Sequence, residues 1–205
     1  KQVVEQHEKR LPFRSAVCTL LYLAYNTRAD ILFAVCKLAK ACICPGELDF
    51  RALIWLFGYL RRRPSYALKF YPDGTSNPIY NICAQHSIPY SDLTVFSDAS
   101  WQDCPDTGRS TVGYMIFHNG ALIEANSTMP TPIAMSTSEA EYMAASEAVK
   151  EALFIKKLMP AFGSPLSVVP ICTDSQGSLA WLKNPVTSAR SKHVDVMHHF
   201  ARERV

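Results

Sequence analysis

Apolar residues recur at helical spacing through the first third of the chain. Three segments, Phe13 to Tyr25, Ile31 to Ala41 and Glu47 to Arg62, carry an apolar side chain every three or four residues. This period predicts three helices, with Pro45-Gly46 separating the second from the third. In the third helix we expect the inward side to consist of Leu53, Ile54, Leu56, Phe57 and Leu60.

A basic cluster, Arg61-Arg62-Arg63, ends the third predicted helix just before Pro64. Cationic side chains interact favourably with a helix C-terminus, so the cluster can be explained as a helix end that also keeps the surface charged. The other interpretation is contact with the phosphates of a nucleic acid. The sequence alone favours the first interpretation and leaves the second open.

The composition of the chain changes at residues 72–91. They contain Pro72, Gly74, Pro78 and Pro89 together with several serines and asparagines. Such residues favour turns and loops, so we predict a linker over 72–91. It would join a helical domain at residues 1–71 to a second domain at residues 92–205.

Strand patterns dominate after this linker. Leu93–Ser97, Thr111–His118 and Ala121–Ala125 alternate as short strands, and Asn119-Gly120 is a hairpin turn signal. Helical spacing follows from Ser138 to Met159, then an apolar strand at Val168–Thr173, a short helix at Gln176–Lys183 and a last helix from Ser191. The order strand, strand, strand, helix, strand, helix, helix predicts an α/β fold with a mixed sheet flanked by helices.

Composition narrows the class of protein. The chain has 205 residues, of which 48% are hydrophobic, so it can bury a core. No uncharged apolar run approaches the roughly 18 residues of a membrane span. The seven cysteines form no C-x-x-C pair, which argues against a zinc knuckle or a disulfide framework and favours a reducing compartment. Because the charged start at Lys1 is neither an initiator nor a signal peptide, we expect a piece of a longer protein.

Charge is divided unevenly along the chain. The net charge is +3, with 12 Lys/Arg against 6 Asp/Glu in residues 1–90 and 9 against 12 in residues 91–205. A basic surface attracts phosphate backbones, and acidic side chains that cluster nearby suggest a metal site. An unevenly charged but purely solvated surface is the alternative.

Three carboxylates occupy positions where the predicted strands and helix meet. Asp98 ends the strand from Leu93, Asp174 ends the strand from Val168, and Glu141 lies in the first turns of the long helix. If the two strands are neighbours and the helix crosses them, the three side chains converge. Mg²⁺ prefers such oxygen ligands, and a pair of ions can promote phosphodiester cleavage. Taken singly, each aspartate could instead belong to a turn, and Asp174 could cap the helix at Gln176.

Glu139 must be distinguished from its neighbour Glu141. Glu139 follows Ser136 by three residues, the spacing of a capping box, which assigns it a local role at the helix start. Glu141 has no such local role, and it shares a helix face with the small residues Ala144, Ala145 and Ala148. We therefore place Glu141, and not Glu139, in the candidate site.

Short motifs around these residues resemble the ribonuclease H region of copia-type retrotransposon polyproteins. They occur in that region's order and are Ser97-Asp98-Ala99-Ser100-Trp101, Gly108-Arg109-Ser110-Thr111-Val112-Gly113-Tyr114, Ser138-Glu139-Ala140-Glu141-Tyr142-Met143-Ala144 and Lys192-His193-Val194-Asp195-Val196. Upstream, the segment that joins reverse transcriptase to this region resembles Phe13-Arg14-Ser15-Ala16-Val17, Leu20-Leu21-Tyr22-Leu23-Ala24 and Thr27-Arg28-Ala29-Asp30-Ile31. The likeness covers nearly the whole chain.

The resemblance implies a ribonuclease H-like fold preceded by a helical connection segment. It further implies cleavage of the RNA strand of an RNA–DNA hybrid with two Mg²⁺ or Mn²⁺ ions, which Asp98, Glu141 and Asp174 would bind. The implied partners are the hybrid and the reverse transcriptase portion of the same polyprotein, in a cytoplasmic retroelement particle or in the nucleus. The alternative is an inactive or domesticated remnant that binds nucleic acid or a protein without cutting.

Two departures from this family pattern affect the interpretation. The stretch from Glu124 to Met129 replaces an expected strand end rich in Trp, Ser and Lys. A fifth strand and a fourth carboxylate are also expected, and we place them beyond Val205. We do not favour Asp195 as the fourth carboxylate, since surface pairing with His199 or Arg202 explains it. The spacing of His193, His198 and His199 does not put two histidines on one helix face, which argues against a zinc site.

Overall fold

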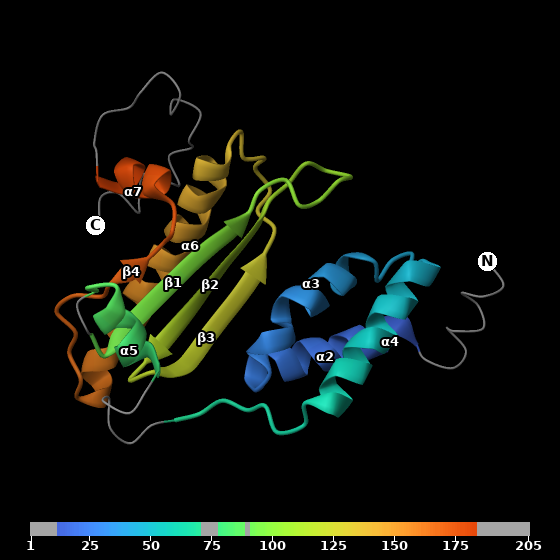
Figure 1. Cartoon of the computed structure of the whole chain (residues 1–205), viewed down its shortest axis with the longest axis horizontal. Coiled ribbons are helices and arrows are strands. Elements are labelled where there is room, and N and C mark those ends of the chain that lie inside the picture. The colour runs from blue at the N-terminus through green and yellow to red at the C-terminus, as the bar shows by residue number, and fades with distance from the viewer. Residues whose placement is uncertain (1–11, 71–77, 89–90, 184–205) are drawn as a thin grey trace. The chain divides into compact units, whose positions relative to one another are not determined.

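The computed structural model describes residues 12–70, 78–88 and 91–183. The chain divides into two compact units, Lys1–Leu68 and Lys69–Val205 (Figure 1). The division at Leu68 falls close to the end of the predicted helical domain, whose limits stay a prediction. Each unit has its own core and is described by itself.

In its described residues, 12–68, the first unit contains three α-helices and a short 3₁₀ turn, and the three predicted helices are present. They are α2 (Phe13–Asn26), α3 (Leu32–Lys40) and α4 (Glu47–Arg62), with η1 (Ala29–Ile31) between α2 and α3. The rings of Phe13 and Phe50 meet edge to face at 5.1 Å in the core. Leu53 and Leu56 are buried beside them, whereas Ile54 and Phe57, which were expected to face inward, are exposed.

The second unit is built on a four-stranded mixed sheet in the order β3-β2-β1-β4 (Figure 1). Strands β1 (Leu93–Ser100), β2 (Thr111–His118) and β3 (Ala121–Thr128) are antiparallel, and β4 (Ile171–Cys172) pairs in parallel with β1. The helices described in this unit are α5 (Pro78–Gln85), α6 (Thr137–Leu158) and α7 (Gln176–Lys183), and η3 (Met159–Phe162) follows α6. The predicted α/β class, a mixed sheet flanked by helices, is confirmed and is compatible with a ribonuclease H-like fold.

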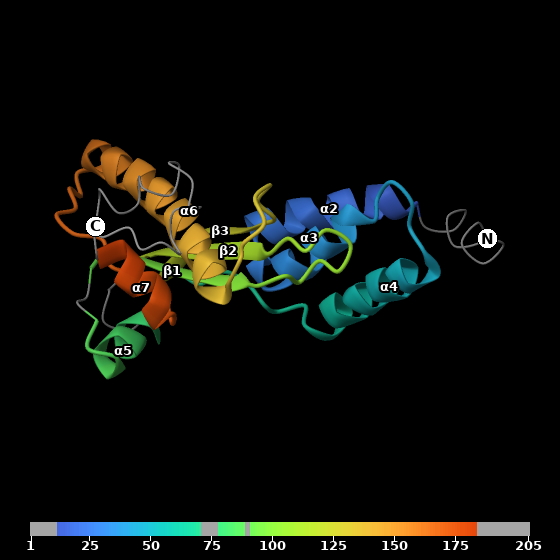
Figure 2. The ribbon, with the colours of Figure 1, turned by 90° about the horizontal axis from the view of Figure 1, so that it is seen from above.

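Helix α6 covers the sheet and makes its core. It lies across the strands (Figure 2) and packs on β1 and β2. Ala148 and Ala152 of α6 contact Leu93, Val95 and Ile116 of the sheet, and all five are buried. Small side chains on this face let the helix approach the strands closely, so a carboxylate on the same face is held near the sheet.

The hairpin between β2 and β3 follows the prediction from Asn119-Gly120. Both residues adopt positive φ, 47° for Asn119 and 76° for Gly120. A two-residue turn of this kind matches the twist of the flanking strands and favours Asn followed by Gly. The turn therefore sets the register of β3 against β2 for the pairs next to it, and the register shifts by one residue between Phe117 and Ile116.

The structure corrects three expected element limits. The predicted linker contains helix α5, which buries Ile79 and Cys83. Strand β4 covers only Ile171–Cys172 of the predicted Val168–Thr173, because Pro170 has no N–H to donate and contributes only its carbonyl, which accepts a bond from Val95 N. Strand β1 continues to Ser100, since its pairing with β2 runs to Thr111.

The structure also bears on the cysteines, on membrane-spanning helices and on the predicted helix from Ser191. None of the seven cysteines, which all lie in the described residues, forms a disulfide, and Cys83 is the one that is buried. Among the described residues, no helix has the length and apolar character that crossing a membrane requires. The predicted helix from Ser191, with Asp195 and the histidines at 193, 198 and 199, lies outside the described residues.

Candidate metal centre

Asp98, Glu141 and Asp174 come from three different elements of the second unit. Asp98 lies within β1, opposite Gly113 of β2, and therefore does not close the strand as expected. Asp174 follows β4 directly, and Glu141 lies near the start of α6. Because β1 and β4 run parallel, their C-terminal ends meet at one edge of the sheet, and α6 begins over that edge.

The three side chains converge. One carboxylate oxygen from each lies within 4.8 Å of the other two. Asp98 and Asp174 are exposed and Glu141 is half-buried, so the group opens to solvent on one side. Two oxygens bound to one Mg²⁺ lie up to about 4.2 Å apart, since each Mg–O distance is about 2.1 Å. The limit of 4.8 Å between these oxygens is slightly larger than this, so the three carboxylates would hold one divalent cation after moving together by a few tenths of an ångström, or could bridge a pair as they stand.

The hydrogen bonding of Glu141 is incomplete. Its Oε1 accepts from the backbone N–H of Ala99 at 3.2 Å. Its Oε2 is buried and has no hydrogen-bond partner within the part of the chain that the structure describes. A buried carboxylate oxygen without a partner costs free energy, and a cation at this point would satisfy it. The donor set and this oxygen fit a hard divalent ion.

The protonation of Glu141 reflects the same surroundings. Burial, which is the largest cause, and the negative charges of Asp98 and Asp174 together raise the pKa of Glu141 to about 7, against the opposing effect of the bond from Ala99 N–H. Ionising all three carboxylates at this separation costs free energy, because their negative charges repel each other. A bound cation would remove that repulsion, so metal binding and proton release at Glu141 should be coupled.

The capping roles inferred for neighbouring residues are resolved by the hydrogen bonds. Ser136 Oγ accepts from Glu139 N at 3.2 Å, and Glu139 Oε2 accepts from Met135 N at 2.7 Å. Glu139 thus acts at the start of α6. It accepts from the N–H of Met135, one residue before the Ser136 N–H that a capping box would use. At α7 the cap is Ser175, whose Oγ accepts from Ser178 N at 3.2 Å. Asp174 is therefore not the helix cap.

Helix α7 is anchored against α6 in a way that positions Asp174. Leu182 of α7 is buried with Tyr142 and Val149 of α6. The ring of Trp181 packs edge to face on Tyr142 at 6.0 Å. The sequence does not single out these anchoring residues. Their only signal is the apolar pattern of one eight-residue helix, which does not indicate which element it packs against.

A loop joins β1 to β2 beside the three acids and is braced at both ends. Trp101 Nε1 donates to the carbonyl of Ala134 at 3.0 Å. Thr111 Oγ1 donates to both carboxylate oxygens of Asp103, at 2.9 and 2.8 Å. Asp103 is thereby bound within the loop and does not join the acidic group.

Glu124, in the stretch that departs from the family pattern, also has a local partner. Tyr114 Oη donates to Glu124 Oε1 at 2.9 Å, and Asn126 Nδ2 donates to the same hydroxyl at 3.4 Å. This polar cluster links β2 to β3. Glu124 is therefore explained by sheet packing and need not belong to a metal site.

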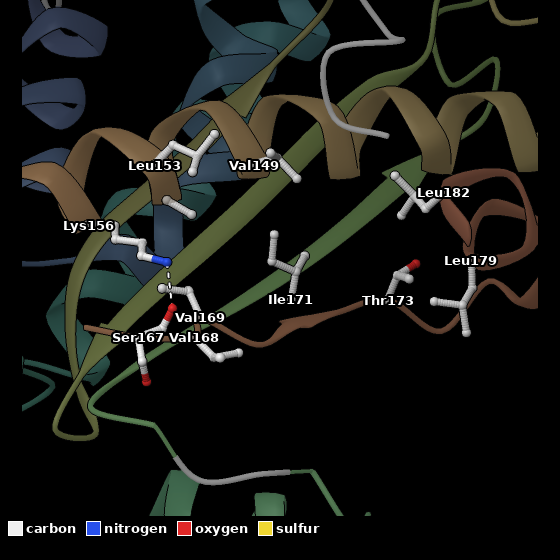
Figure 3. Close-up of a pocket in the computed structure, with 11 residues that line it drawn as sticks. Val149, Leu153, Lys156, Ser167, Val168, Val169, Ile171, Thr173, Leu179 and Leu182 are labelled. Carbon is white, nitrogen blue, oxygen red and sulfur yellow. Dashed lines mark hydrogen bonds between the residues drawn. The ribbon is translucent and has the colours of Figure 1, made fainter. Parts of the chain in front are cut away.

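A separate cavity of about 370 Å³ lies between α6, β4 and α7 (Figure 3). Its walls are mostly apolar, with Leu153 from α6, Ile171 from β4 and Leu182 from α7. Lys156 Nζ at one end donates to the carbonyl of Ser167 at 2.6 Å. No carboxylate lines this cavity, so the candidate metal centre is confined to the three acids.

Known proteins resemble the chain along most of its length. No protein-family model matches it. It is 33% identical over 196 residues to the retrovirus-related Pol polyprotein from transposon TNT 1-94 of Nicotiana tabacum, covering 96% of the chain and 14% of that polyprotein. It is 30% identical over 194 residues to the Pol polyprotein from transposon RE1 of Arabidopsis thaliana, covering 94% of the chain and 12% of that polyprotein.

A shorter relative matches over nearly all of its own length. This protein is the secreted RxLR effector protein 161 of Plasmopara viticola, 33% identical over 147 residues. The match covers 72% of the chain and 93% of the effector protein. The same region therefore occurs both inside long polyproteins and as most of a much shorter protein.

Proposed function

We propose that the chain derives from a retrovirus-related Pol polyprotein of a transposon, which it resembles at 30–33% identity over most of its length, and that its second unit is a ribonuclease H-type endonuclease. It would cut the RNA strand of an RNA–DNA hybrid. The observation that carries the proposal is the convergence of Asp98, Glu141 and Asp174, whose ligand oxygens lie within 4.8 Å of one another.

The three carboxylates would hold one or two Mg²⁺ or Mn²⁺ ions. When bound, such ions activate a water molecule and stabilise the leaving oxygen of a phosphodiester. Asp98 and Asp174 are exposed and would face the substrate, while Glu141 is held from behind by the N–H of Ala99. The same three charges repel a phosphate backbone when no cation neutralises them, so productive binding of the hybrid requires the ions.

The resemblance to these polyproteins suggests the remaining partners. We propose that the reverse transcriptase portion of the same polyprotein is the second partner, with the first unit as the connection between the two activities. The site of action would be a cytoplasmic retroelement particle, with the nucleus as the alternative. Either Arg61 to Arg63, or Lys156 and Lys157, are the basic residues proposed to contribute to hybrid binding.

One observation favours a second candidate function. The effector protein of Plasmopara viticola consists almost entirely of the region that matches this chain. A segment of this kind can therefore exist outside a polyprotein. The second candidate is a retroelement-derived remnant that binds nucleic acid or a protein partner and does not cut.

The test is cleavage of a hybrid whose RNA strand is labelled, with Mg²⁺ or Mn²⁺ present, together with a calorimetric titration of Mn²⁺. Asp98→Asn keeps the shape of the side chain and removes its charge. It should abolish cleavage and weaken Mn²⁺ binding while the circular dichroism spectrum stays unchanged. Asp106→Asn is the matched control, because Asp106 is an exposed acid outside the group of three.

The outcomes separate the two candidates. Cleavage that is lost with Asp98→Asn and kept with Asp106→Asn supports the enzyme. A folded protein that binds Mn²⁺ through Asp98 but cuts no hybrid supports the remnant. Equal cleavage by wild type and Asp98→Asn would show that the three acids are not the active site.

A further inference from the structure

Helix α4 of the first unit presents a basic and aromatic face to solvent. Arg51, Trp55, Gly58 and Arg62 follow one another at spacings of three and four residues, so they share one side of the helix. The Trp55 side chain is 75% exposed, although tryptophan is usually well buried. Beside it lies a hollow of about 380 Å³, lined by Ile54, Trp55, Gly58, Tyr59, Arg62 and Arg63.

Gly58 keeps the floor of this hollow open. Glycine is less favourable than alanine within a helix, and it is usually retained where another group approaches closely. Here a Cβ added at Gly58 would meet no atom within 4 Å. Packing therefore does not explain the glycine, and its effect is to leave bare backbone between the Trp55 ring and the Arg62 guanidinium.

The C-terminal end of α4 is capped in part by a residue from outside the helix. The buried Arg28, from the turn after α2, donates from Nη1 to the carbonyl of Arg63 at 3.1 Å. Arg63 in turn donates to Tyr66 Oη at 3.2 Å. Arg62 is exposed and lies on the side of the hollow, so its charge is available to a ligand.

The wall of the hollow is held in place by the same network. Tyr59 Oη donates to Asp30 Oδ2 at 2.9 Å, and Arg28 binds both oxygens of that carboxylate at 2.9 Å. The Arg28 guanidinium lies 5.8 Å from the centre of the Tyr59 ring. Little side-chain freedom is then lost at Tyr59 when a ligand binds, which favours affinity.

We propose that this hollow binds a nucleotide of single-stranded nucleic acid, with the base on Trp55 and the phosphate at Arg62. An exposed ring next to a guanidinium matches a planar base next to an anionic phosphate. Bases within a duplex are stacked on each other, so Trp55 selects unpaired strands. Residues 12–68 carry eight Lys/Arg and three Asp/Glu, a net charge of +5 that favours a polyanion.

This site lies in the first unit and does not depend on the three acids or on cleavage. The test therefore uses the whole 205-residue chain in a chelating buffer without divalent ions. Binding of a short fluorescein-labelled oligothymidylate is followed by fluorescence anisotropy over a range of salt concentrations. A blunt DNA duplex of the same length is the comparison ligand.

Three variants probe the parts of the site. Trp55→Ala should weaken binding of the single strand on the order of 5- to 100-fold, because it removes a stacking platform. Arg62→Gln should reduce the slope of log affinity against log salt by about 0.7, the value for one phosphate contact on a single strand. Gly58→Ala should weaken binding by filling the hollow, although alanine favours the helix.

Tyr22→Ala is the matched control, because Tyr22 is 73% exposed on α2 and lies outside the hollow. It should bind the oligonucleotide as wild type does, and all variants should keep the wild-type circular dichroism spectrum. The proposal is overturned if Trp55→Ala and Gly58→Ala bind like wild type, or if Tyr22→Ala is weakened as much as Trp55→Ala. It is equally overturned if the duplex binds as tightly as the single strand, or if no oligonucleotide binds at low salt.

Discussion

Gly177 in the first turn of α7 packs directly on Ser138 in the first turn of α6. A Cβ added at Gly177 would lie 2.5 Å from Ser138 Oγ and 3.1 Å from Ser138 Cβ. Asp174 precedes Gly177 by three residues, and Glu141 follows Ser138 by three. The contact between the two helix starts thus sets how closely these two carboxylates approach.

Replacing Gly177 by alanine should therefore disturb the candidate metal centre without touching a carboxylate. Overpacking of this kind costs about 1–3 kcal/mol, so Gly177→Ala should lower the free energy of unfolding and weaken Mn²⁺ binding. Urea denaturation and calorimetric titration measure the two effects.

The double variant Gly177→Ala with Ser138→Gly supplies the control for this clash. Ser138→Gly removes both atoms that the new Cβ would meet. Mn²⁺ affinity should recover in the double variant relative to Gly177→Ala alone. Unchanged Mn²⁺ affinity in Gly177→Ala would mean that the approach of α7 does not position Asp174.

The raised pKa of Glu141 predicts how the metal-free protein responds to pH. Its pKa rises from 4.5 to about 7 on folding, so between these values the folded state holds a proton that the unfolded state has released. The stabilisation is complete below pH 4.5 and is lost as pH rises through about 7. Glu141→Gln should therefore have the higher melting temperature at pH 8 in a chelating buffer, and a flatter pH dependence.

The same titration sets the pH dependence of ion binding. A cation must displace the proton from Glu141, so Mn²⁺ affinity should fall as pH drops below about 7. Glu139→Gln is the control and should leave the pH dependence of Mn²⁺ affinity unchanged. Glu139 accepts from Met135 N and lies outside the group of three. Identical pH profiles of melting temperature for wild type and Glu141→Gln would contradict the assignment of the buried proton to Glu141.

Arg28 should be the most sensitive charged residue of the first unit. Its side chain is only 8% exposed and binds both oxygens of Asp30, whose pKa is lowered by that bond. Lysine cannot make the paired bonds, so Arg28→Lys should destabilise the unit by about 2–3 kcal/mol. Urea denaturation followed by far-UV circular dichroism measures the change.

The exposed pair of Arg51 and Glu47 provides the comparison for Arg28. Its side chains are 69% and 43% exposed, and surface pairs contribute about 0–1 kcal/mol. Arg51→Lys should therefore leave the denaturation midpoint nearly unchanged. A loss as large as that of Arg28→Lys would show that burial is not what makes the Arg28 contacts stabilising.

Ser136 should contribute measurably to the start of α6. Its Oγ accepts from Glu139 N, and loss of an N-cap side chain costs about 1 kcal/mol. Ser136→Ala should lower the melting temperature by a few degrees in a thermal scan. Ser100→Ala, at an exposed position at the end of β1, should lower it by less, and the reverse order would exclude the capping role.

The sequence predicted the elements of the fold better than their limits. Apolar period and turn residues located the three first helices, the hairpin at Asn119-Gly120 and helix α6. The end of β1 could not be found in this way, because Asp98 to Ser100 are polar or small and are kept in the strand by pairing with β2. Helix α5 was hidden by the prolines and serines around it, since only Ile79 and Cys83 mark its buried side.

The residues of the candidate site could be predicted from the sequence, but their burial, hydrogen bonding and packing could not. The order of Asp98, Glu141 and Asp174 along strand, helix and strand indicates convergence. The partnerless Oε2 of Glu141 and the contact of Gly177 with Ser138 depend on distances between helices that no local pattern contains. The burial of Arg28 was likewise unforeseen, because an arginine is normally exposed unless a partner such as Asp30 is placed for it.

The parallel pairing of β4 with β1 has a consequence for how the second unit assembles. The hairpins of β1, β2 and β3 join neighbours in sequence, whereas β1 ends at Ser100 and β4 begins only at Ile171. Closing the long connection between these strands costs chain entropy before their pairing is formed, so we expect Asp98 to be in place before Asp174 arrives. An ion that needs all three carboxylates can then bind only the assembled unit and shifts the folding equilibrium by mass action, by roughly 2.7 kcal/mol at a hundred times its Kd. The supply of divalent ions would thus govern what fraction of the domain is folded as well as what it does.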